Sequence, residues 1–248
     1  MPVRNDLLAA LPEYEFEALK SYLRRTELSG GMLLHDAGEP VERVYFLDSG
    51  AASLVIEMKA GETIETALVG RDGVIGGHAA LQNRPPLTKA FIQIAGTAHV
   101  VNAAQLRQFC DTHGTLVELI GQHNDLVQAQ AQQLAACNAV HPLEARLCRW
   151  LLRAHELCGP QFSLTQEQLA TFLGVRRTSV SLTAHALQQE GIIRYRRGTV
   201  EIMDIEPLKH GACECHDALH AYKARLEGSG VASLQAASVA RPLEARRV

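Results

Sequence analysis

The side chains with the clearest chemical potential lie between positions 164 and 202, where hydroxyl and guanidinium groups accompany two short predicted helices. Thr165 precedes a Gln-Glu-Gln run and is a typical helix N-cap. The apolar residues of positions 169–173 share one face of a short helix, and Gly174 supplies a tight turn before a second helix that starts near Arg176. Two helices joined in this way form a helix-turn-helix, whose second helix presents its N-terminal residues to the major groove of DNA.

The start of the second helix is rich in hydroxyl and arginine side chains, which can donate hydrogen bonds to phosphates or to base edges. Residues 191–202 then predict a β-hairpin with a basic tip, a form that suits a wing against the phosphate backbone. The alternative is a small helical domain with a solvated basic hairpin. The DNA contacts are predicted at Thr165, Gln166, Arg176, Arg177, Thr178, Ser179, Ser181, Arg194, Arg196 and Arg197.

The charge of the chain is unevenly distributed. Its 248 residues carry 24 Lys+Arg and 27 Asp+Glu, a net charge of −3, and 47% of them are apolar. This composition excludes a disordered chain and a strongly basic packaging protein. Residues 1–141 hold 10 Lys+Arg against 16 Asp+Glu, a net of −6, whereas residues 174–198 hold five arginines against Glu190 alone, a net of +4. The positive charge is therefore local to the predicted DNA-binding segment.

Upstream of this segment, short β-rich runs alternate with glycine-containing turns from Gly30 to about Val101. Runs of this length with a turn about every ten residues predict a compact β-roll or barrel. The first 28 residues carry leucines at helical spacing with a break at Pro12, and they predict two short helices. The predicted strands are 32–34, 44–47, 52–56, 63–69 and 91–94.

Residues 114–140 hold no proline and predict one long helix, which Pro142 closes. One stripe along it has the alternating three- and four-residue spacing of a heptad seam, although two of its positions are polar. We interpret the stripe as a dimerisation surface in which the polar residues fix the register; a helix packed on its own domain is the alternative. The residues of the stripe are Ile120, His123, Val127, Gln130 and Leu134.

Taken together, these motifs resemble the Crp/Fnr family of bacterial transcription regulators from about Leu11 to Leu226. In the N-terminal half the resemblance rests on the Gly-Glu-Pro at 38–40, on the run Val-Tyr-Phe-Leu-Asp-Ser-Gly at 44–50 and on the Gly-Arg-Asp-Gly at 70–73. In the C-terminal half it rests on Leu-Gly-Val-Arg-Arg at 173–177 with the arginine-rich wing.

The resemblance implies an α+β fold in three parts. An N-terminal double-stranded β-helix, a jelly-roll-like sensor β-roll similar to cyclic-nucleotide-binding domains, would occupy residues 1–113, a dimerisation helix 114–141 and a winged helix-turn-helix 142–227. Residues 228–248, rich in Ala, Ser and Arg, are expected to form a mobile tail. The resemblance further implies a homodimer on a two-fold-symmetric double-stranded DNA operator, with RNA polymerase as an additional partner.

The second helix departs from the family's usual Arg-Glu-Thr/Ser-Val start. Arg177 and Ser179 keep their positions, but Thr178 replaces the Glu, and Leu182 replaces an Arg that usually follows. Arg177 is expected to pair with guanine through O6 and N7. The two replacements predict an operator unlike the family's best-known half-site.

The segment that would hold a cyclic nucleotide departs further. Members that bind cyclic AMP carry Gly-Glu for the ribose and Arg-Ser/Thr-Ala for the phosphate, but here Gly77 stands in the place of the Glu and Thr88 in that of the Arg. Lys89 is a point charge that replaces a bidentate Arg poorly. We therefore expect a ligand other than cyclic AMP, or none, and predict no cofactor. The candidate effector pocket comprises Gly76, Gly77, His78, Thr88 and Lys89.

The six cysteines are predicted to be reduced thiols in a cytoplasmic protein, because the chain shows no signal peptide and no long apolar run, which also argues against a membrane partner. Cys213, Cys215 and His216 are the weak candidates for a metal site. Their spacing is not a common zinc pattern, so buried thiols are the main interpretation and a redox switch is the alternative. An iron–sulfur sensor is disfavoured because the first cysteine is Cys110.

The sequence gives little support for other functions. His78, His99 and His123 could ligate a haem, but nothing in their spacing favours one. Metalloprotease, Walker and serine-hydrolase motifs are missing from the sequence, so an enzyme is not expected. A small-ligand or cyclic-nucleotide module that acts through protein contacts, and a thiol- or metal-responsive regulator, remain the alternatives to a DNA-binding regulator.

Overall fold

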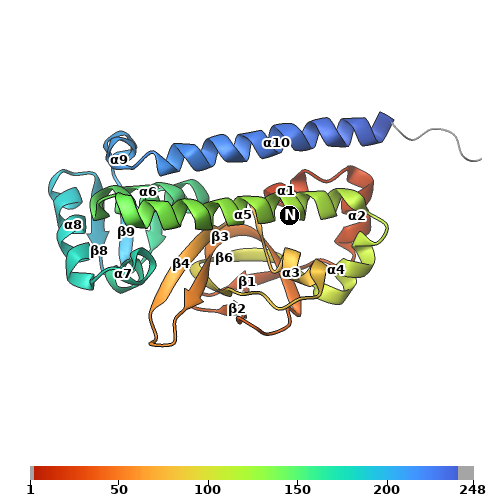
Figure 1. Cartoon of the computed structure of the whole chain (residues 1–248), viewed down its shortest axis with the longest axis horizontal. Helices are drawn as coiled ribbons and strands as arrows, with labels where there is room; N and C mark the ends of the chain where they lie inside the picture. Colours follow the sequence, from red (N-terminus) through yellow and green to blue (C-terminus); the bar gives the residue numbers. More distant parts are fainter. Residues whose placement is uncertain (1–2, 240–248) are drawn as a thin grey trace, which may run out of the picture.

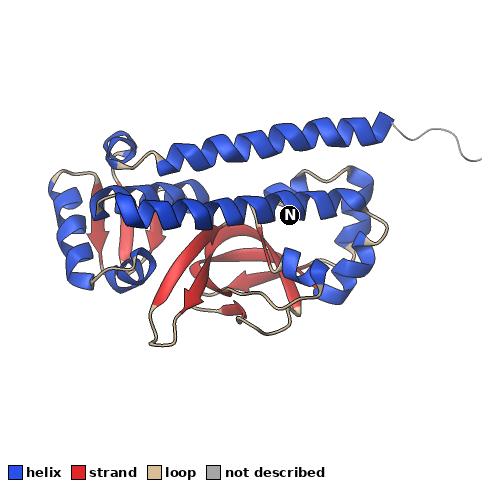
Figure 2. Cartoon of the chain, in the orientation of Figure 1, coloured by secondary structure: helices blue, strands red, loops and turns tan. Residues whose placement is uncertain are grey.

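The structure, a computed structural model, describes residues 3–239, with side chains up to residue 228. Figures 1 and 2 show a β-rich N-terminal half, a helical C-terminal half and the long helices α5 and α10 lying along both. The helices are α1 Asp6–Ala9, α2 Glu13–Lys20, α3 Gly77–Gln82, α4 Ala103–Cys110, α5 Gly114–Val140, α6 Leu143–Cys158, α7 Gln166–Leu173, α8 Arg177–Gln189, α9 Ile205–Gly211 and α10 Cys215–Val239. The strands are β1 Arg24–Leu28, β2 Leu33–His35, β3 Arg43–Glu57, β4 Thr63–Val69, β5 Val74–Ile75, β6 Lys89–Asn102, β7 Gln161–Ser163, β8 Ile193–Arg196 and β9 Thr199–Ile202.

The N-terminal half is an antiparallel sheet in the order β1-β6-β3-β4, with β2 added to β6 and β5 added to β3. The two predicted strands 44–47 and 52–56 form one strand, β3, which passes through Gly50 with a positive φ of 77°. A Cβ at Gly50 would lie 2.4 Å from the carbonyl oxygen of Ile94, so only glycine lets β3 bend this close to β6. The bend curls the sheet into the predicted roll.

The prediction of helix throughout the first 28 residues is wrong for its last part. Residues Arg24–Leu28 form β1, which pairs with β6 from Arg24 opposite Val100 to Leu28 opposite Gly96. The backbone hydrogen bonds of this ladder outweigh the local helical spacing of the leucines, because strand pairing is decided by a partner distant in sequence. The helices predicted on either side of Pro12 are present as α1 and α2.

Helix α5 spans the predicted range, but its heptad stripe faces the chain itself. Ile120, His123, Gln130 and Leu134 are buried, and the amide oxygen of Gln130 accepts a hydrogen bond from the backbone N–H of Leu68 at 3.3 Å. For these residues the structure supports the alternative of a helix packed on its own domain. The assignment of this stripe to a dimer interface is therefore wrong for the buried residues, because the β-roll and α10 already cover them; dimerisation itself stays a prediction.

The winged half is not packed separately from the roll. One apolar core joins α6, α7, α8 and the small sheet β7-β9-β8 to Ala51, Leu68 and Ile94 of the roll. The Trp150 ring in this core stacks on Phe172 at 5.9 Å between centroids. The position of the helix-turn-helix is thus set by apolar contacts to the β-roll.

Helix α10 runs back alongside α5 and extends through residues 228–239, where the sequence suggested a tail (Figure 1). The remainder of that predicted tail, residues 240–248, lies outside the described residues, and mobility stays a prediction. Between residues 3 and 239, no helix combines the length and the apolar character needed to cross a membrane.

Candidate DNA-binding face, effector cavity and the contacts between them

The helix-turn-helix is built by local signals that the sequence displays. Thr165 and Gln168 form a capping box, in which the Thr165 hydroxyl accepts from the N–H of Gln168 and the Thr165 N–H donates to the Gln168 side chain. Gly174 ends α7 in the left-handed conformation, with φ 62°. Arg176 is the N-cap residue of α8, and Val180 begins the buried face of that helix.

The N-terminus of α8 presents exposed donors. Arg176, Arg177 and Thr178 are exposed, and the Arg177 Nε lies 3.7 Å from a Glu167 carboxylate oxygen in a solvent-exposed ion pair. Such a pair contributes little stability, so it leaves Arg177 available for a stronger anion such as a phosphate. Ser179 is only partly exposed.

Two of the predicted DNA contacts bind each other instead of facing outward. The Ser181 hydroxyl donates to the side-chain oxygen of Gln166 at 2.5 Å, which fastens α8 to the start of α7. Gln166 and Ser181 therefore brace the two helices, while Thr165 stays exposed beside them.

The wing turns through a two-residue hairpin at Arg197 and Gly198, with φ 48° and 76°. Positive φ at both positions is the geometry of a type I′ turn. Arg196 and Arg197 are exposed and have no ion pair among the residues that the structure describes. Arg194, in contrast, is paired with Glu201 of the neighbouring strand. The cations that the wing offers to a ligand are therefore those of its tip.

Tyr195 joins the wing to α8 and to the segment just before α7. Its hydroxyl donates to the carbonyl of Leu164, and its backbone N–H donates to the side chain of Gln188 at 2.7 Å. Burial raises the pKa of Tyr195 to about 12, so its hydroxyl remains a donor throughout the neutral range. The wing thus has a fixed position relative to α8.

A cavity of about 570 Å³ lies between the β-roll, the segment around α3 and helix α5. Of the predicted pocket, Gly76, Gly77 and His78 line it, but Thr88 and Lys89 are not among its lining residues. The Lys89 ammonium instead lies 3.3 Å from a carboxylate oxygen of Glu57. The structure therefore gives no support for Lys89 in the pocket, because its ammonium faces Glu57 of the neighbouring strand β3. The lining residues that the sequence did not reveal include His35, Arg84, His123, Asn124 and Val127.

Neutral imidazoles and one guanidinium give this cavity its polarity. Burial lowers the pKa of His123 to about 4 and also lowers that of His35, so both rings are neutral at pH 7. Arg84 supplies a permanent positive charge. A basic residue next to the Pro-Pro of positions 85–86 was a sequence signal for this role, four residues before the position that the family pattern indicates.

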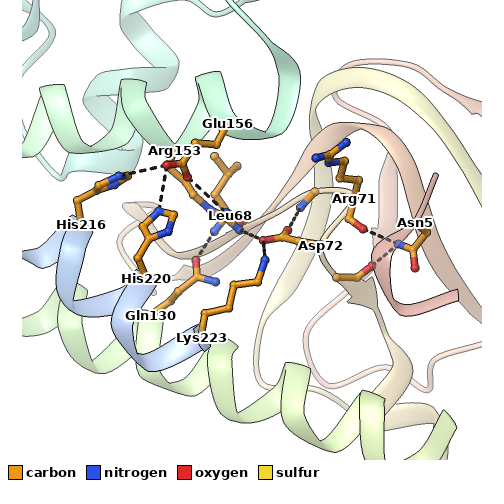
Figure 3. Close-up of polar contacts among 12 residues, drawn as sticks. Asn5, Leu68, Arg71, Asp72, Gln130, Arg153, Glu156, His216, His220 and Lys223 are labelled. Carbon is orange, nitrogen blue, oxygen red and sulfur yellow. Dashed lines mark hydrogen bonds and ion pairs between the residues drawn. The ribbon is translucent and has the colours of Figure 1, made fainter. Parts of the chain in front are cut away.

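A buried polar cluster connects the cavity wall to the winged half (Figure 3). Asp72, just before β5, accepts from the Arg153 guanidinium of α6 at 2.7 Å and faces the Lys223 ammonium of α10 at 3.5 Å. Burial alone would raise the pKa of Asp72, but the charges of Arg153 and Lys223 hold it well below its usual range. On the other side of this turn, the Asn5 amide donates to the carbonyls of Arg71 and Gly73. The turn is fixed from both sides.

The cluster continues onto the exposed side of α10. The Glu156 carboxylate of α6 lies 3.1 Å from His216 and 3.0 Å from His220. Burial would raise the pKa of Glu156, but the hydrogen bond from His216 and the charge of His220 lower it. Polar contacts thus attach α10 to α6, in addition to its packing along α5.

A second buried link joins β4 to α6 directly. The Glu65 carboxyl accepts from the Trp150 indole N–H at 2.7 Å and from the Ser53 hydroxyl at 2.6 Å. Burial raises the pKa of Glu65 to about 7, despite these two hydrogen bonds. Sequence patterns gave no sign of this pair, since its members lie far apart in the chain.

Two family profiles match the chain in the order in which the two halves occur. Residues 25–113 match the cyclic nucleotide-binding domain, and residues 145–210 match the Crp-like helix-turn-helix domain. The chain is 23% identical over 205 residues to the cyclic AMP receptor protein of Thermus thermophilus, covering 81% of this chain and 93% of that protein.

Solved structures share the fold at low sequence identity. FixK2 of Bradyrhizobium japonicum superposes with a TM-score of 0.65 at 14% identity, over 77% of this chain and 98% of that one. The c-di-GMP-responsive global regulator CLP of Xanthomonas campestris superposes with a TM-score of 0.62 at 16% identity, over 78% and 100%. At these identities the likeness establishes the fold and leaves the ligand of this chain open.

Proposed function

The chain belongs to the Crp/Fnr family of transcriptional regulators, and on that premise we propose that it is a homodimer that reads a two-fold-symmetric DNA operator. The family comprises regulators rather than enzymes. The observation that carries the proposal is the exposed N-terminus of α8, where Arg176, Arg177 and Thr178 accompany the unpaired wing-tip cations Arg196 and Arg197. The expected further partner is RNA polymerase, and the expected compartment is the cytoplasm.

The test is to select bound sequences from a random duplex pool and to titrate the selected duplex at several salt concentrations. A palindromic selected site is expected, and log K should fall with log salt by about 0.9 for each phosphate that the protein contacts. No enrichment of any sequence, or an affinity indifferent to salt, would contradict the proposal.

The proposed dimer contact lies on the outward face of α5 instead of the buried stripe. Val117 and Ala135 are exposed on this face, and Gly121 and Ala131 are partly exposed. Small side chains at helical spacing suit the close approach of a second helix. An Ala131→Glu/Ala135→Glu variant should therefore be monomeric by light scattering. Gln132→Glu, which adds a charge at an exposed position facing the groove beside α10, is the control and should remain dimeric. Equal behaviour of the two variants would place the interface elsewhere.

We further propose that the cavity binds a small effector other than cyclic AMP. Gly77 offers no carboxylate for a ribose, and Thr88 and Lys89 lie outside the lining, so a cyclic phosphate would have only Arg84 as a cationic partner. Calorimetric titration should give no binding of cyclic AMP at micromolar concentration. Micromolar affinity that Arg84→Ala abolishes would overturn this part of the proposal.

The route from cavity to DNA face is proposed to run through the turn of residues 70–73. This turn leads into Val74 and Gly76 of the cavity wall, and its Asp72 contacts Arg153 of α6. A ligand that displaces the wall would therefore act on the helix that supports the helix-turn-helix. An Asp72→Asn variant should retain DNA binding, but the change in its DNA affinity when cell extract is added as the source of effector should differ from that of the unaltered chain. The same change in affinity for both chains would exclude this route.

A further inference from the structure

The structure brings together four side chains that the sequence leaves far apart, at the junction of α5, α6 and α10. Cys137 and the C-cap residue His141 lie one turn apart at the end of α5, Cys215 is the first residue of α10, and Cys213 lies just before it. One ligand atom of each lies within 4.8 Å of all the others. The three thiols are buried. His216, which the sequence suggested as a partner, belongs instead to the cluster with Glu156.

We propose that Cys137, His141, Cys213 and Cys215 bind one Zn²⁺ ion. Three thiolates and an imidazole are a common ligand set for structural zinc, which is tetrahedral with Zn–S bonds of about 2.3 Å. Tetrahedral geometry at that bond length places the ligand sulfurs about 3.8 Å apart. The Cys137 and Cys213 sulfurs are 3.5 Å apart, and the Cys215 sulfur is 3.5 Å from the His141 Nδ1. The ligand atoms are therefore at the separation that one ion needs.

The groups around the four ligands also suit a metal site. The His141 Nε2, on the far side of the ring from the thiols, lies 3.1 Å from a carboxylate oxygen of Glu214. A histidine that ligates zinc commonly donates its other N–H to a carboxylate, which fixes the ring and its tautomer. The Gln133 amide donates to the Cys215 sulfur at 3.1 Å, a contact that favours a thiolate.

The charge balance around the cluster favours bound metal. Three thiolates, one neutral imidazole and Zn²⁺ carry a net charge of about −1. The nearby Arg149 is buried, and its Nε and one Nη have no hydrogen-bond partner among the described residues. Zinc binds cysteine as the thiolate, so an occupied site would give the buried guanidinium an anionic neighbour.

The apolar packing at this junction is sparse, so a bound ion would have a structural role. The apolar cluster that holds the start of α10 consists of the three thiols and Ala145, and no large aliphatic side chain belongs to it. So few apolar atoms provide little burial energy for fixing a helix end. A zinc ion would hold α10 to the end of α5, and hence to the first turn of α6.

Two other outcomes must be separated from zinc binding at these four side chains. Cys137 and Cys213 could form a disulfide, although their sulfurs would have to approach to about 2.05 Å. A metal could instead bind at Glu156, His216 and His220, whose ligand atoms also lie together. The experiment below distinguishes these outcomes from the proposed site.

The test uses the full chain purified under reducing conditions. Elemental analysis should find one zinc per chain, and blocking the thiols with a mercurial should release it to a colorimetric chelator. Replacing zinc by Co²⁺ should give sulfur-to-cobalt charge-transfer absorption and the strong visible bands of a tetrahedral site. This spectrum is recorded on the unaltered sequence, so it does not depend on whether a variant folds.

Variants then assign the ligands. Cys215→Ser and His141→Gln should lose the zinc, and the milder Glu214→Gln should weaken its binding about 10- to 100-fold. His220→Gln, which disrupts the neighbouring cluster, and Cys110→Ser, which removes a distant thiol, should retain it. Substoichiometric zinc without cobalt–thiolate bands, a disulfide between Cys137 and Cys213 in chain purified without reductant, or loss of metal in His220→Gln would each overturn the proposal.

Discussion

The helix-turn-helix face and the cavity between the β-roll and α5 could be predicted from the sequence to very different extents. The residues of the face occupy one continuous segment, and their placement depends on a capping box, a glycine turn and a two-residue hairpin. The cavity takes its lining from the roll, the segment around α3 and the middle of α5. A motif whose geometry is local can be located from its residues, whereas a cavity formed by distant segments cannot. The following predictions test this contrast and the contacts that join the two regions.

Removing the Trp150 side chain should have the greatest effect, because it joins the two regions. Its ring is buried against Phe172, and its N–H donates to Glu65 across the boundary. Trp150→Ala should lower the free energy of unfolding by about 3–5 kcal/mol, as measured by urea denaturation. Trp150→Phe keeps much of the ring contact and should cost about 1–3 kcal/mol for the lost donor. A loss for Trp150→Ala within the roughly 0.5 kcal/mol typical of surface sites would mean that the two halves are not coupled here.

Within the DNA-binding face, the α8 start and the wing tip should behave differently. Arg177→Ala should weaken binding to the selected operator by about 1–3 kcal/mol and relax specificity at one position. Arg196→Ala should weaken binding to all duplexes alike and reduce the salt slope by about one. Fluorescence anisotropy with operator and scrambled duplexes measures both. If Arg177→Ala lost equal affinity on the two duplexes, Arg177 would be a phosphate contact rather than a base reader.

The buried acids between the two regions predict opposite pH dependences. The pKa of Glu65 is raised from 4.5 to about 7, so the folded chain binds a proton that the unfolded chain releases in this window, and stability falls as pH rises through it. The lowered pKa of Asp72 stabilises the fold above the ordinary value of 3.8, and this stabilisation is lost at more acidic pH.

Urea denaturation at a series of pH values separates the two contributions. Glu65→Gln should remove the decline between about pH 4.5 and 7 while leaving the acid limb. Asp72→Asn should remove part of the acid limb and leave the decline. Identical pH profiles for Glu65→Gln and the unaltered chain would show that the burial of Glu65 does not control its titration.

Lys89→Ala should have almost no effect, because Lys89 forms a partly exposed ion pair with Glu57 and lies outside the cavity lining. Its free energy of unfolding should stay within about 0.5 kcal/mol of the original. Arg84→Ala is the matched comparison, since it removes a cation that does line the cavity. If Lys89→Ala changed the response of DNA binding to cell extract and Arg84→Ala did not, the original sequence prediction would be right.

Much of the fold could be predicted from sequence because it depends on local patterns. Helix α5 and strand β4 occur within the expected bounds, and both helices of the helix-turn-helix lie where the capping and turn residues place them. Strand β1 was missed because residues 24–28 gain their strand hydrogen bonds only from β6. The stripe on α5 combines apolar residues with the polar His123 and Gln130, and periodicity alone cannot say whether such a face meets a partner or the same chain.

The sequence by itself determined the order of the two halves, the helix-turn-helix with its exposed arginines, and the departure of positions 77 and 88 from the cyclic AMP pattern. The helix-turn-helix depends on neighbours within a few residues, where capping, turn chemistry and periodicity act, whereas the departure at positions 77 and 88 follows from the resemblance to the Crp/Fnr family. Only the tertiary structure decided which side chains line the cavity, that Glu65 meets Trp150, and that Cys137 and His141 join Cys213 and Cys215. These meetings depend on how distant segments pack, and packing is a property of the whole chain.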